Sequence, residues 1–507
     1  MKRIKPSLKG QRILFAEHYI DDRLSTDHDV YAFDALLEKI DLSAIVNSYG
    51  SSGGELFAPR DMIAILLYAY SKGITSSYKI ANEIRSNIAF IYLAGGQIIH
   101  RRTICDFRKR NVEHLRPLLS STIQNAISVD LLHEDVIFAL DGSKFSADAS
   151  KSKTKTKDDW EARRVKIQRS VENYFDELEK NDDAEDGIEE ENARKHEERM
   201  RKIRELKMSN NKMEARDARR AERMIREANR IDMVLEAHPD LKPTERVNIT
   251  EPESRLMKNG TGEYLQGFNA QIITSNQIIC AADLVQDEND QACLIPMVEA
   301  LEKEIPVGNS YKLLTDAGYN KGTNLKWLAG KENIDAYVSM NDRKEDAKSD
   351  LEKAIGRSAF EYDENEDHFI CPTGKALNFQ RTRTSGAIEY SIYRADHNDC
   401  QKCSGRHSCL LTVADKKAGA KIIEDDGTLS HRNAMKEKMS RAESKRIYAE
   451  RAIEPEPVWG QMKKNLGIRR FRMRTFSSMC GEFVLTAIAS NLSKLIRFQV
   501  KQKMATV

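Results

Sequence analysis

The first 130 residues carry apolar side chains at helical spacing. The runs DMIAILLYAYSKG and HLRPLLSSTIQNAI place these side chains three and four positions apart, which is typical of helices that bury one face. Between them, YKIANEIRSNIAFIYLAGG and HRRTICDFRKRN predict two more helices about a glycine-containing turn. Residues 1–130 are therefore predicted to form an all-helical domain.

The pattern changes to strand-like spacing after residue 130. Val136 to Leu140 form a continuous apolar run that predicts a buried strand, with Asp141-Gly142 turning the chain at its end. Further segments predict a hairpin, a helix, a strand, a helix and a strand: GEYLQGFNAQIITS with QIICAADLVQ, ACLIPMVEALEKEI, YKLLTDAGY, GTNLKWLAGKE and IDAYVSM. This order predicts an α/β fold, α+β overall, in which residues 131–150 and 246–341 form a mixed sheet with helices on its faces.

Two insertions interrupt this core. Residues 151–245 are highly charged, and the stretch from Lys151 to about His238 has no proline and a single glycine, which predicts a helical hairpin with its turn in the acidic stretch 181–191. We interpret it as an arm for dimer contact or DNA, and the alternative is a solvated appendage or a partly disordered linker. Residues 342–430 form a second, cysteine-containing insertion, and residues 431–507 return as the C-terminal helical part of the core.

Composition narrows the function classes. The net charge of +2 on 507 residues, 32% of them charged, means that any nucleic-acid binding must rely on local basic patches. No apolar run approaches the roughly 18 residues of a membrane span, and the basic start MKRIKPSLKGQR leads to too short an apolar stretch for a signal peptide. We therefore expect a cytoplasmic protein, without a membrane partner, whose eight cysteines are reduced.

Three dispersed acids are the candidate chemistry. Asp141 and Asp316 each follow an apolar run and should lie on neighbouring strands, and Glu456 stands seven residues before Lys463, on the same helical face. Carboxylates gathered in this way suit two Mg²⁺ or Mn²⁺ ions for phosphodiester cleavage, although any one of the 79 acids is far more often a solvated charge. Arg451 and Lys463 would bind phosphate, and Tyr448, which shares a face with Arg451, would pack against or hydrogen-bond the same DNA strand.

Other acids remain alternatives. Pro455 and Pro457 bracket Glu456 and predict a helix break near residue 455, so Glu454 is a rival third ligand. Glu482 is a weaker rival, more typical of an ordinary charge on a packed helix. Asp283 and Asp290 also lie near strand ends, and we interpret them either as structural residues or as residues that support the site.

Basic residues define the candidate DNA contacts. In HRRTICDFRKRN, Thr103 would cap a helix that turns Ile104 and Phe107 inward. The basic ridge predicted on its outer face comprises Arg101, Arg102, Arg108, Lys109 and Arg110. The alternative is a solvated basic face. A second basic run that could contact the DNA backbone comprises Arg469, Arg470, Arg472 and Arg474.

The second insertion holds four of the cysteines. Cys400 and Cys403 form a Cys-x-x-Cys pair that suits tetrahedral zinc, and Cys371 and Cys409 would supply the remaining ligands, with His407 as a substitute. The alternative is a group of free thiols in a β-rich subdomain. The other four cysteines are interpreted as small buried apolar residues: Cys105, Cys280, Cys293 and Cys480.

These residues carry a resemblance that spans nearly the whole chain. The stretches AGGQIIHRRTICDFRKRN, ALDGSKFSADASK, NITEPESRLMK, YLQGFNAQ, LLTDAGYNKGTN and EPVWGQMKKNLGIRRFRMR resemble a DDE transposase of the bacterial insertion-sequence kind, with an N-terminal helical DNA-binding domain and a ribonuclease H-like catalytic domain. The resemblance implies a triad of Asp141, Asp316 and Glu456 and a Tyr-Arg-Glu-Lys signature at Tyr448, Arg451, Glu456 and Lys463. The signature departs from the family in placing four residues, not three, between the Arg and the Glu.

The resemblance implies an enzyme that binds the terminal inverted repeats of a mobile element, hydrolyses phosphodiester bonds and joins 3′ hydroxyl ends to target DNA. We expect a homodimer or higher oligomer on DNA, associated with the nucleoid. Two alternatives are a nuclease or resolvase of the same fold that does not join ends, and a catalytically inactive, transposase-derived DNA-binding protein.

Overall fold

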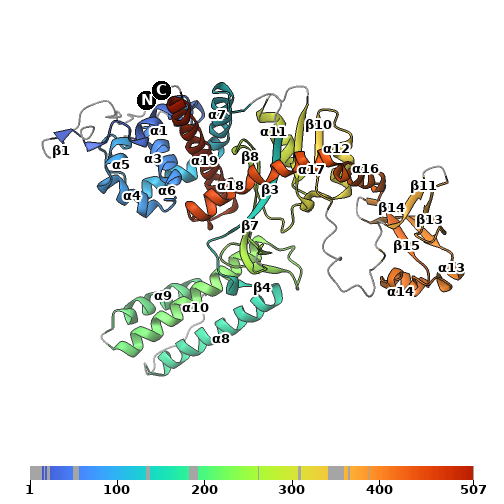
Figure 1. Ribbon diagram of the computed structural model, residues 1–507. Helices are drawn as coiled ribbons and strands as arrows, with labels where there is room; N and C mark the ends of the chain where they lie inside the picture. The colour runs from blue at the N-terminus through green and yellow to red at the C-terminus, as the bar shows by residue number, and fades with distance from the viewer. Residues whose placement is uncertain are drawn as a thin grey trace.

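The computed structural model describes residues 14–15, 18–19, 23–49, 56–132, 137–181, 192–209, 211–260, 262–305, 310–340, 355, 359–363, 366–385 and 388–505. Figure 1 shows a central body with a mixed sheet, helices from the N-terminal part on one side of it, a small β-rich lobe on the other, and a helical arm. The basic positions predicted in residues 101–110, the acids and the cysteines of the second insertion therefore belong to different regions of one molecule.

The N-terminal part is helical apart from two short strands. Its elements are β1 (Leu14–Phe15), β2 (His18–Tyr19), α1 (Asp29–Leu37), α2 (Ser43–Asn47), α3 (Pro59–Ser71), α4 (Ser77–Ser86), α5 (Ile88–Leu93), α6 (Arg101–Arg110), η2 (Val112–His114) and α7 (Leu115–Ser128). The run 78–96 predicted as one helix is divided between α4 and α5 at Asn87, which caps α5 by accepting the N–H of Ala89. Nearly every side chain of α3 is buried, so α3 is the centre of this region.

The partner of α3 comes from the other end of the chain. The long helix α19 (Phe476–Ala505) packs against α3 and α7 and also against the strand β8 (Ile278–Val285). By length and composition α19 could cross a membrane, but 78% of its most apolar 18-residue window is buried inside the protein. It is therefore packed as a core helix that joins the N-terminal helices to the sheet.

The central sheet has the order β8-β7-β3-β9-β10, with β6 beside the first part of β7. Its strands are β3 (Ile137–Ser146), β6 (Arg255–Lys258), β7 (Tyr264–Ser275), β8, β9 (Tyr311–Thr315) and β10 (Ile334–Val338). In the five-strand order, β7 runs antiparallel to its neighbours, while β3, β9 and β10 are parallel. The hairpin β7–β8 turns at Asn276 and Gln277, whose φ angles of 48° and 62° match a turn with left-handed central residues.

Helices cover both faces of this sheet. On one face Ala139, Leu314 and Tyr337 form a small cluster with Ile447 and Tyr448. The opposite face joins the large core shared with α19 and α11. The helices that complete this part are α11 (Leu294–Glu304), η4 (Ala317–Tyr319), α12 (Gly322–Ala329), α16 (Leu429–Ser440), α17 (Ala442–Ala449), η6 (Glu450–Ile453), α18 (Pro455–Gly460) and the π-helix η7 (Gln461–Asn465). The predicted hairpin, helices and strands of the core are confirmed as elements.

Within its described residues the charged insertion contains three helices, where the sequence predicts a two-helix hairpin. They are α8 (Lys157–Asn181), α9 (Asn192–Lys207) and α10 (Lys212–Ala237), and they follow η3 (Lys151–Lys153) and the pairing of β4 (Thr154–Thr156) with β5 (Arg246–Asn248). The helix breaks before Asn211, whose side chain caps α10. A buried row of alanines lets α10 pack against both other helices. Residues 182–191 of the predicted turn lie outside the described residues.

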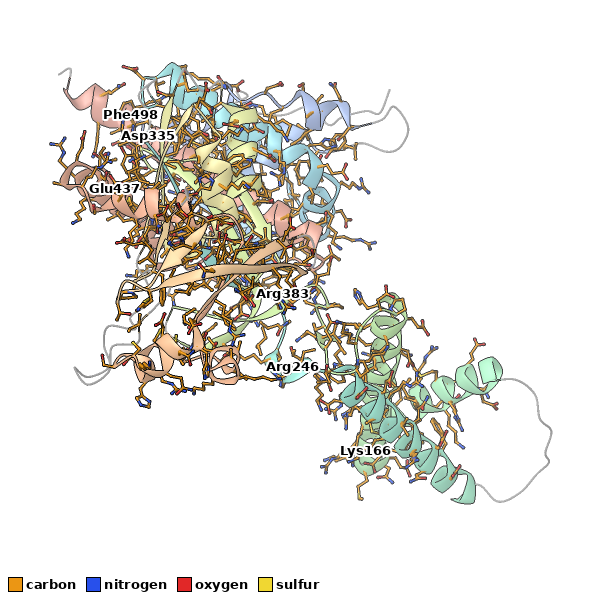
Figure 2. All side chains as sticks on the ribbon, turned by 90° about the vertical axis from the view of Figure 1, so that its right-hand side faces the viewer. Lys166, Arg246, Asp335, Arg383, Glu437 and Phe498 are labelled. Carbon is orange, nitrogen blue, oxygen red and sulfur yellow. The ribbon has the colours of Figure 1, made fainter. Side chains whose placement is uncertain are left out.

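The arm stands apart from the body in Figure 2, with Lys166 on its surface and Arg246 near its base. Ion pairs reinforce its packing: Arg163 contacts Glu227 at 3.2 Å, and Arg164 contacts Asp232 at 2.9 Å. Its role as an arm for dimer contact or DNA stays a prediction.

The cysteine-containing lobe is built on a five-stranded antiparallel sheet. Its elements are β11 (Glu361–Asp363), β12 (His368–Ile370), β13 (Ala376–Ser385), β14 (Ile388–Ala395), α13 (His397–Gln401), α14 (Arg406–Cys409), α15 (Val413–Ala418) and β15 (Ile422–Asp425). Its fully buried core is small and comprises Phe360, Phe369, Leu377, Tyr393, Ala395, Ile423 and Leu429. The lobe lies in the sequence between β10 and α16.

Candidate active site

The sheet brings Asp141 and Asp316 side by side. Leu140 of β3 pairs in parallel with Thr315, the last residue of β9, so the two aspartates occupy the next position on neighbouring strands. Asp316 follows the strand end as predicted, and its carboxylate accepts the N–H of Gly318 at 2.8 Å. The expected adjacency of these two acids is confirmed.

The predicted turn at Asp141-Gly142 is wrong. The strand β3 continues through both residues to Ser146 because it stays paired with β7, where Gly142 lies opposite Gln271. A Cβ on Gly142 would clash with the Gln271 side-chain amide and with the carboxylate of Asp290. The glycine is needed here because polar side chains approach the backbone closely.

Arg451 lies between the two aspartates. Its Nη2 is 2.8 Å from Oδ1 of Asp141 and 3.7 Å from Oδ2 of Asp316. The other oxygen of Asp141, Oδ2, accepts the indole N–H of Trp459 at 3.0 Å. Both oxygens of Asp141 are thus held by groups from the segment that also carries Glu456.

Burial and crowding of negative charge raise the pKa of both aspartates. For Asp141, burial raises the pKa to about 6, and the charges of Asp316 and Asp290 add to the rise, while Arg451 opposes it. For Asp316, burial again raises the pKa, against the lowering effects of Arg451 and the Gly318 N–H. Buried acids that repel one another are typical of sites that take up positive charge.

Asp290 is a further acid at this site. Its Oδ1 accepts hydrogen bonds from Asn269 at 2.6 Å and Gln271 at 2.8 Å, and lies 3.6 Å from Nζ of Lys144. A Cβ on Gly318 would be 3.3 Å from Oδ2 of Asp290 and 2.9 Å from Oδ1 of Asp316, so both carboxylates border this glycine. The interpretation of Asp290 as a supporting residue agrees with this position.

Asp283, the other supporting candidate, is not part of this group. It pairs with Arg116 at 2.9 Å. Strand and helix patterns in the sequence do not reveal which polar side chains point toward an acid, so the contacts of the aspartates with four residues could not be predicted: Trp459, Gln271, Asn269 and Lys144.

The three candidate third acids differ in their surroundings. Glu454 is buried and accepts the backbone N–H groups of Asn276 and Gln277, each at 3.0 Å. Glu456 is exposed in the first turn of α18 and helps to raise the pKa of Arg451. The helix break predicted near residue 455 is confirmed, because η6 ends at Ile453 and α18 starts with Pro455 at its first turn.

Glu482 is not the ordinary helix charge that the sequence suggests. Its side chain is 1% exposed, and one oxygen accepts the N–H groups of Arg472 at 2.8 Å and Met473 at 2.9 Å. It therefore holds the segment before α19 in place. Glu454 and Glu482 both have structural partners, while Glu456 has an exposed carboxylate.

Lys463 and Tyr448 contact the sheet. Nζ of Lys463 donates to Oγ of Ser143 at 2.6 Å and to the carbonyl of Lys144 at 2.7 Å, and it lies 4.4 Å from the ring centre of Phe145. Burial lowers the pKa of Lys463 to about 8, and the charge of Arg469 contributes. Tyr448 packs beside the strands, and burial raises its pKa. Their direct contact with phosphate stays a prediction.

The basic helix α6 needs two corrections. It starts at Arg101 after His100, so Thr103 lies inside the helix and does not cap it. Arg108, predicted on the outer ridge, is 5% exposed and donates to the hydroxyl of Tyr70 at 3.0 Å and the carbonyl of Thr75 at 2.8 Å. Its position places it on the same side as Ile104 and Phe107, and an uncharged residue there would leave these acceptors unpaired.

The remaining basic positions are exposed. On α6 these are Arg101, Arg102, Lys109 and Arg110, and in the second basic run they are Arg469, Arg470, Arg472 and Arg474. Among the residues described, no group of three or more His, Cys, Asp or Glu side chains stands at the spacing of a metal centre. At the aspartates, Arg451 occupies the space between the carboxylates.

Two family models match the chain. One, described as "Transposase DDE domain", matches residues 370–496, from the cysteine-containing lobe through Glu456 into α19. The other, described as "Transposase domain (DUF772)", matches residues 18–110, which end with α6. No curated protein and no solved structure matches the chain. Transposase models thus match both its N-terminal helices and its C-terminal region, and together the two matches support a DDE-type transposase of an insertion sequence.

Proposed function

We propose that this transposase binds the ends of its element, hydrolyses phosphodiester bonds there and joins the resulting 3′ hydroxyls to target DNA, with Asp141, Asp316 and Glu456 as the acids of its active site. The observation that carries the proposal is the pairing of Asp141 and Asp316 on β3 and β9, with Arg451 bound to both. Groups 310 residues apart in the chain meet at one point of the sheet.

The sheet supports a ribonuclease H-like catalytic domain. The order β8-β7-β3-β9-β10, with β7 antiparallel to its neighbours, is the mixed arrangement expected for that architecture, and helices lie on both faces. The first acid lies on the central strand β3 and the second at the end of the adjacent strand. Glu456 then comes from a helix beyond the sheet.

The donor set fits a pair of Mg²⁺ or Mn²⁺ ions. Asp141 and Asp316 are partly buried carboxylates with raised pKa values, and hard divalent cations prefer such oxygen ligands. Asp141, Asp316 and Glu456 would hold the ions. Bound divalent cations supply charge that activates an attacking oxygen and stabilises a leaving oxygen.

The chain's own residues would orient the acids and the substrate. Trp459 fixes one oxygen of Asp141, and Asp290 lies beside Asp316 within a group of side-chain amides. Arg451 holds the aspartates in the structure, and once released from them its fork can bind a phosphate of the DNA. Lys463 holds the π-helical turn after α18 against β3, which sets the position of the helix that carries Glu456.

Element ends would be held by exposed basic side chains. Arg101, Arg102, Lys109 and Arg110 lie exposed on α6 within the region matched by the second transposase model, which supports a phosphate-binding role for this face. Two copies of the chain, or more, would hold the two ends together. As a protein that acts on chromosomal DNA, it would work in the cytoplasm at the nucleoid.

The test uses the full chain and DNA fragments that carry the sequences flanking its reading frame. With Mg²⁺, we expect cleavage at the element ends and joining of a pre-cleaved 3′ end to a second duplex. Asp141→Asn, Asp316→Asn and Glu456→Gln should each abolish both steps and leave DNA binding intact. The matched control is Glu450→Gln, which changes an exposed acid of the same segment and should retain activity.

Each alternative gives a different result. Cleavage without joining of the pre-cleaved end would indicate a nuclease or resolvase. DNA binding without Mg²⁺-dependent cleavage would indicate an inactive, transposase-derived binding protein. Cleavage by Asp141→Asn at the wild-type rate would refute the assignment of the site.

A further inference from the structure

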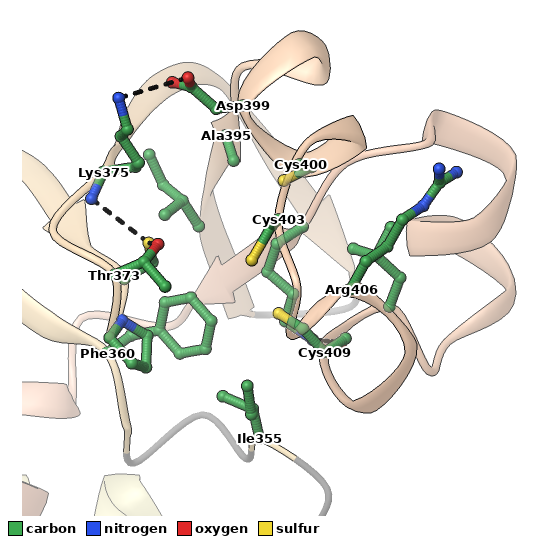
Figure 3. Close-up of a pocket in the computed structure, with 15 residues that line it drawn as sticks. Ile355, Phe360, Thr373, Lys375, Ala395, Asp399, Cys400, Cys403, Arg406 and Cys409 are labelled. Carbon is green, nitrogen blue, oxygen red and sulfur yellow. Dashed lines mark hydrogen bonds and ion pairs between the residues drawn. The ribbon is translucent and has the colours of Figure 1, made fainter.

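The β-rich lobe contains a pocket that all four of its cysteines line. These are Cys371, Cys400, Cys403 and Cys409, and the close-up in Figure 3 shows labelled thiols from Cys400, Cys403 and Cys409 around one space. Cys371 follows β12, Cys400 lies in α13, and Cys409 ends α14, so separate elements supply the thiols. The pocket encloses a cavity of about 50 Å³.

The backbone around these cysteines forms tight turns. At Cys371, the Sγ accepts the N–H of Lys375 at 3.3 Å and lies 3.0 Å from Oγ1 of Thr373. This turn passes through Gly374, which has a φ of 79°. At the second pair, the N–H of Cys403 reaches the carbonyl of Cys400 at 3.4 Å. Turns that direct N–H groups at sulfur and set two cysteines three residues apart suit metal thiolates.

The distribution of cysteines distinguishes this group from ordinary packing. All eight cysteines of the chain are free thiols. Cys280 and Cys293 are buried as predicted, while Cys105 and Cys480 are half-buried, and these four lie apart from the pocket. Four free thiols around an unfilled cavity would stabilise the lobe little by packing, because an unfilled cavity lowers the stability of the folded protein.

The lobe also has a small hydrophobic core that a bound metal would stabilise. Among the described residues its hydrophobic cluster has seven buried members, and cores of this size commonly require a metal or disulfides. Positive side chains at the pocket suit four thiolates around a divalent ion, which together carry a net negative charge. Lys375, Arg406 and Lys421 line it, and Nζ of Lys421 donates to the carbonyl of Cys409 at 3.2 Å.

We propose that Cys371, Cys400, Cys403 and Cys409 bind one structural Zn²⁺ ion. The thiols line the pocket but do not yet converge, since within the described part of the chain no three such side chains reach metal spacing. Binding therefore requires the side chains to rotate inward until each sulfur is about 2.3 Å from the ion. The thiols release their protons to solvent as the zinc thiolate bonds form. His407 is not among the residues that line the pocket.

The site is independent of the two-metal chemistry proposed above. It lies in the sequence between β10, which borders the strand leading to Asp316, and α16, which leads toward Glu456. A zinc ion held by these cysteines would fix the lobe and would not use either aspartate, since neither lines the pocket. Its loss should therefore unfold the lobe first.

The test measures zinc in the full chain purified without chelators. We expect about one zinc ion per chain, released by a thiol-modifying reagent. Replacing zinc with Co²⁺ should give the visible bands of a tetrahedral thiolate site. Cys403→Ser should lose the bound metal and the spectrum, whereas Cys105→Ser, whose thiol donates to Ser77 at 3.2 Å, should retain both.

The wild-type measurements keep the proposal testable even if Cys403→Ser does not fold. Absence of zinc from the wild type together with absence of a Co²⁺ thiolate spectrum would overturn the proposal. So would a spectrum that survives in folded Cys403→Ser. Hydrogen exchange should localise the effect of zinc removal to residues 359–428, and protection lost equally across the whole chain would contradict a site confined to this lobe.

Discussion

Replacing the first aspartate should make the metal-free protein more stable while it abolishes cleavage. The pKa of Asp141 is raised from 3.8 to about 6, and each pH unit between the folded and unfolded pKa is worth about 1.4 kcal/mol. Keeping this carboxylate ionised therefore costs the folded protein about 3 kcal/mol. Asparagine removes the charge, but it can accept one hydrogen bond where Asp141 accepts two, from Arg451 and Trp459. The lost hydrogen bond reduces the gain in stability by about 1 kcal/mol.

The net expectation for Asp141→Asn is a gain of about 2 kcal/mol in the free energy of unfolding, which is roughly 2 °C in the midpoint for a chain of 507 residues. The direction of the pH dependence follows from the raised pKa of Asp141. Above about pH 6 the ionised acid destabilises the wild type in full, and the penalty disappears as the pH falls below about 4. The stability advantage of the variant should therefore be present at about pH 8 and shrink at about pH 4.5.

The assay is thermal unfolding in chelator at both pH values, repeated with Mg²⁺. Added Mg²⁺ should stabilise the wild type more than Asp141→Asn, because binding to the folded state raises its stability. Glu450→Gln serves as the control and should unfold like the wild type. A variant no more stable than the wild type at about pH 8, or an advantage that does not change with pH, would refute the reasoning.

Three further predictions concern neighbouring residues. Arg451→Met should lower metal-free stability by about 3 kcal/mol, because it leaves two crowded carboxylates unpaired, and Mg²⁺ should restore part of the loss in denaturation curves. Glu454→Gln should lower the free energy of unfolding by about 1–3 kcal/mol and leave cleavage nearly unchanged. Glu456→Gln should leave stability nearly unchanged and abolish cleavage. Unfolding and cleavage are measured for both variants. Arg108→Leu should lower the free energy of unfolding by about 3 kcal/mol. Arg102→Ala should preserve stability and weaken DNA binding, and the slope of the logarithm of the binding constant against the logarithm of the salt concentration should fall in magnitude by about 1.

The sequence was sufficient for elements whose apolar pattern is decided locally. The hairpin β7–β8, the helices α11 and α12, and the strands β9 and β10 all appear where alternation or helical spacing predicts them. The adjacency of Asp141 and Asp316 also followed, since each was tied to a strand in the same sheet.

Long-range contacts explain the errors. The Asp141-Gly142 pair looks like a turn, but pairing with β7 carries the strand through it, and the glycine makes room for Gln271 and Asp290. Arg108 looks like part of an exposed ridge because the sequence does not show that Tyr70 and Thr75 lie beside it and accept its hydrogen bonds. The roles of Glu454 and Glu482 likewise depend on backbone groups that approach from distant segments.

Helix α19 has a consequence for the order in which this protein is made. It packs against α3 and α7, yet it begins only at Phe476, so the N-terminal helices lack their main partner until translation has passed that residue. The ribosome must therefore synthesise the chain beyond residue 476 before the N-terminal region can complete its core. A premature stop anywhere upstream of α19 would damage both ends of the protein together.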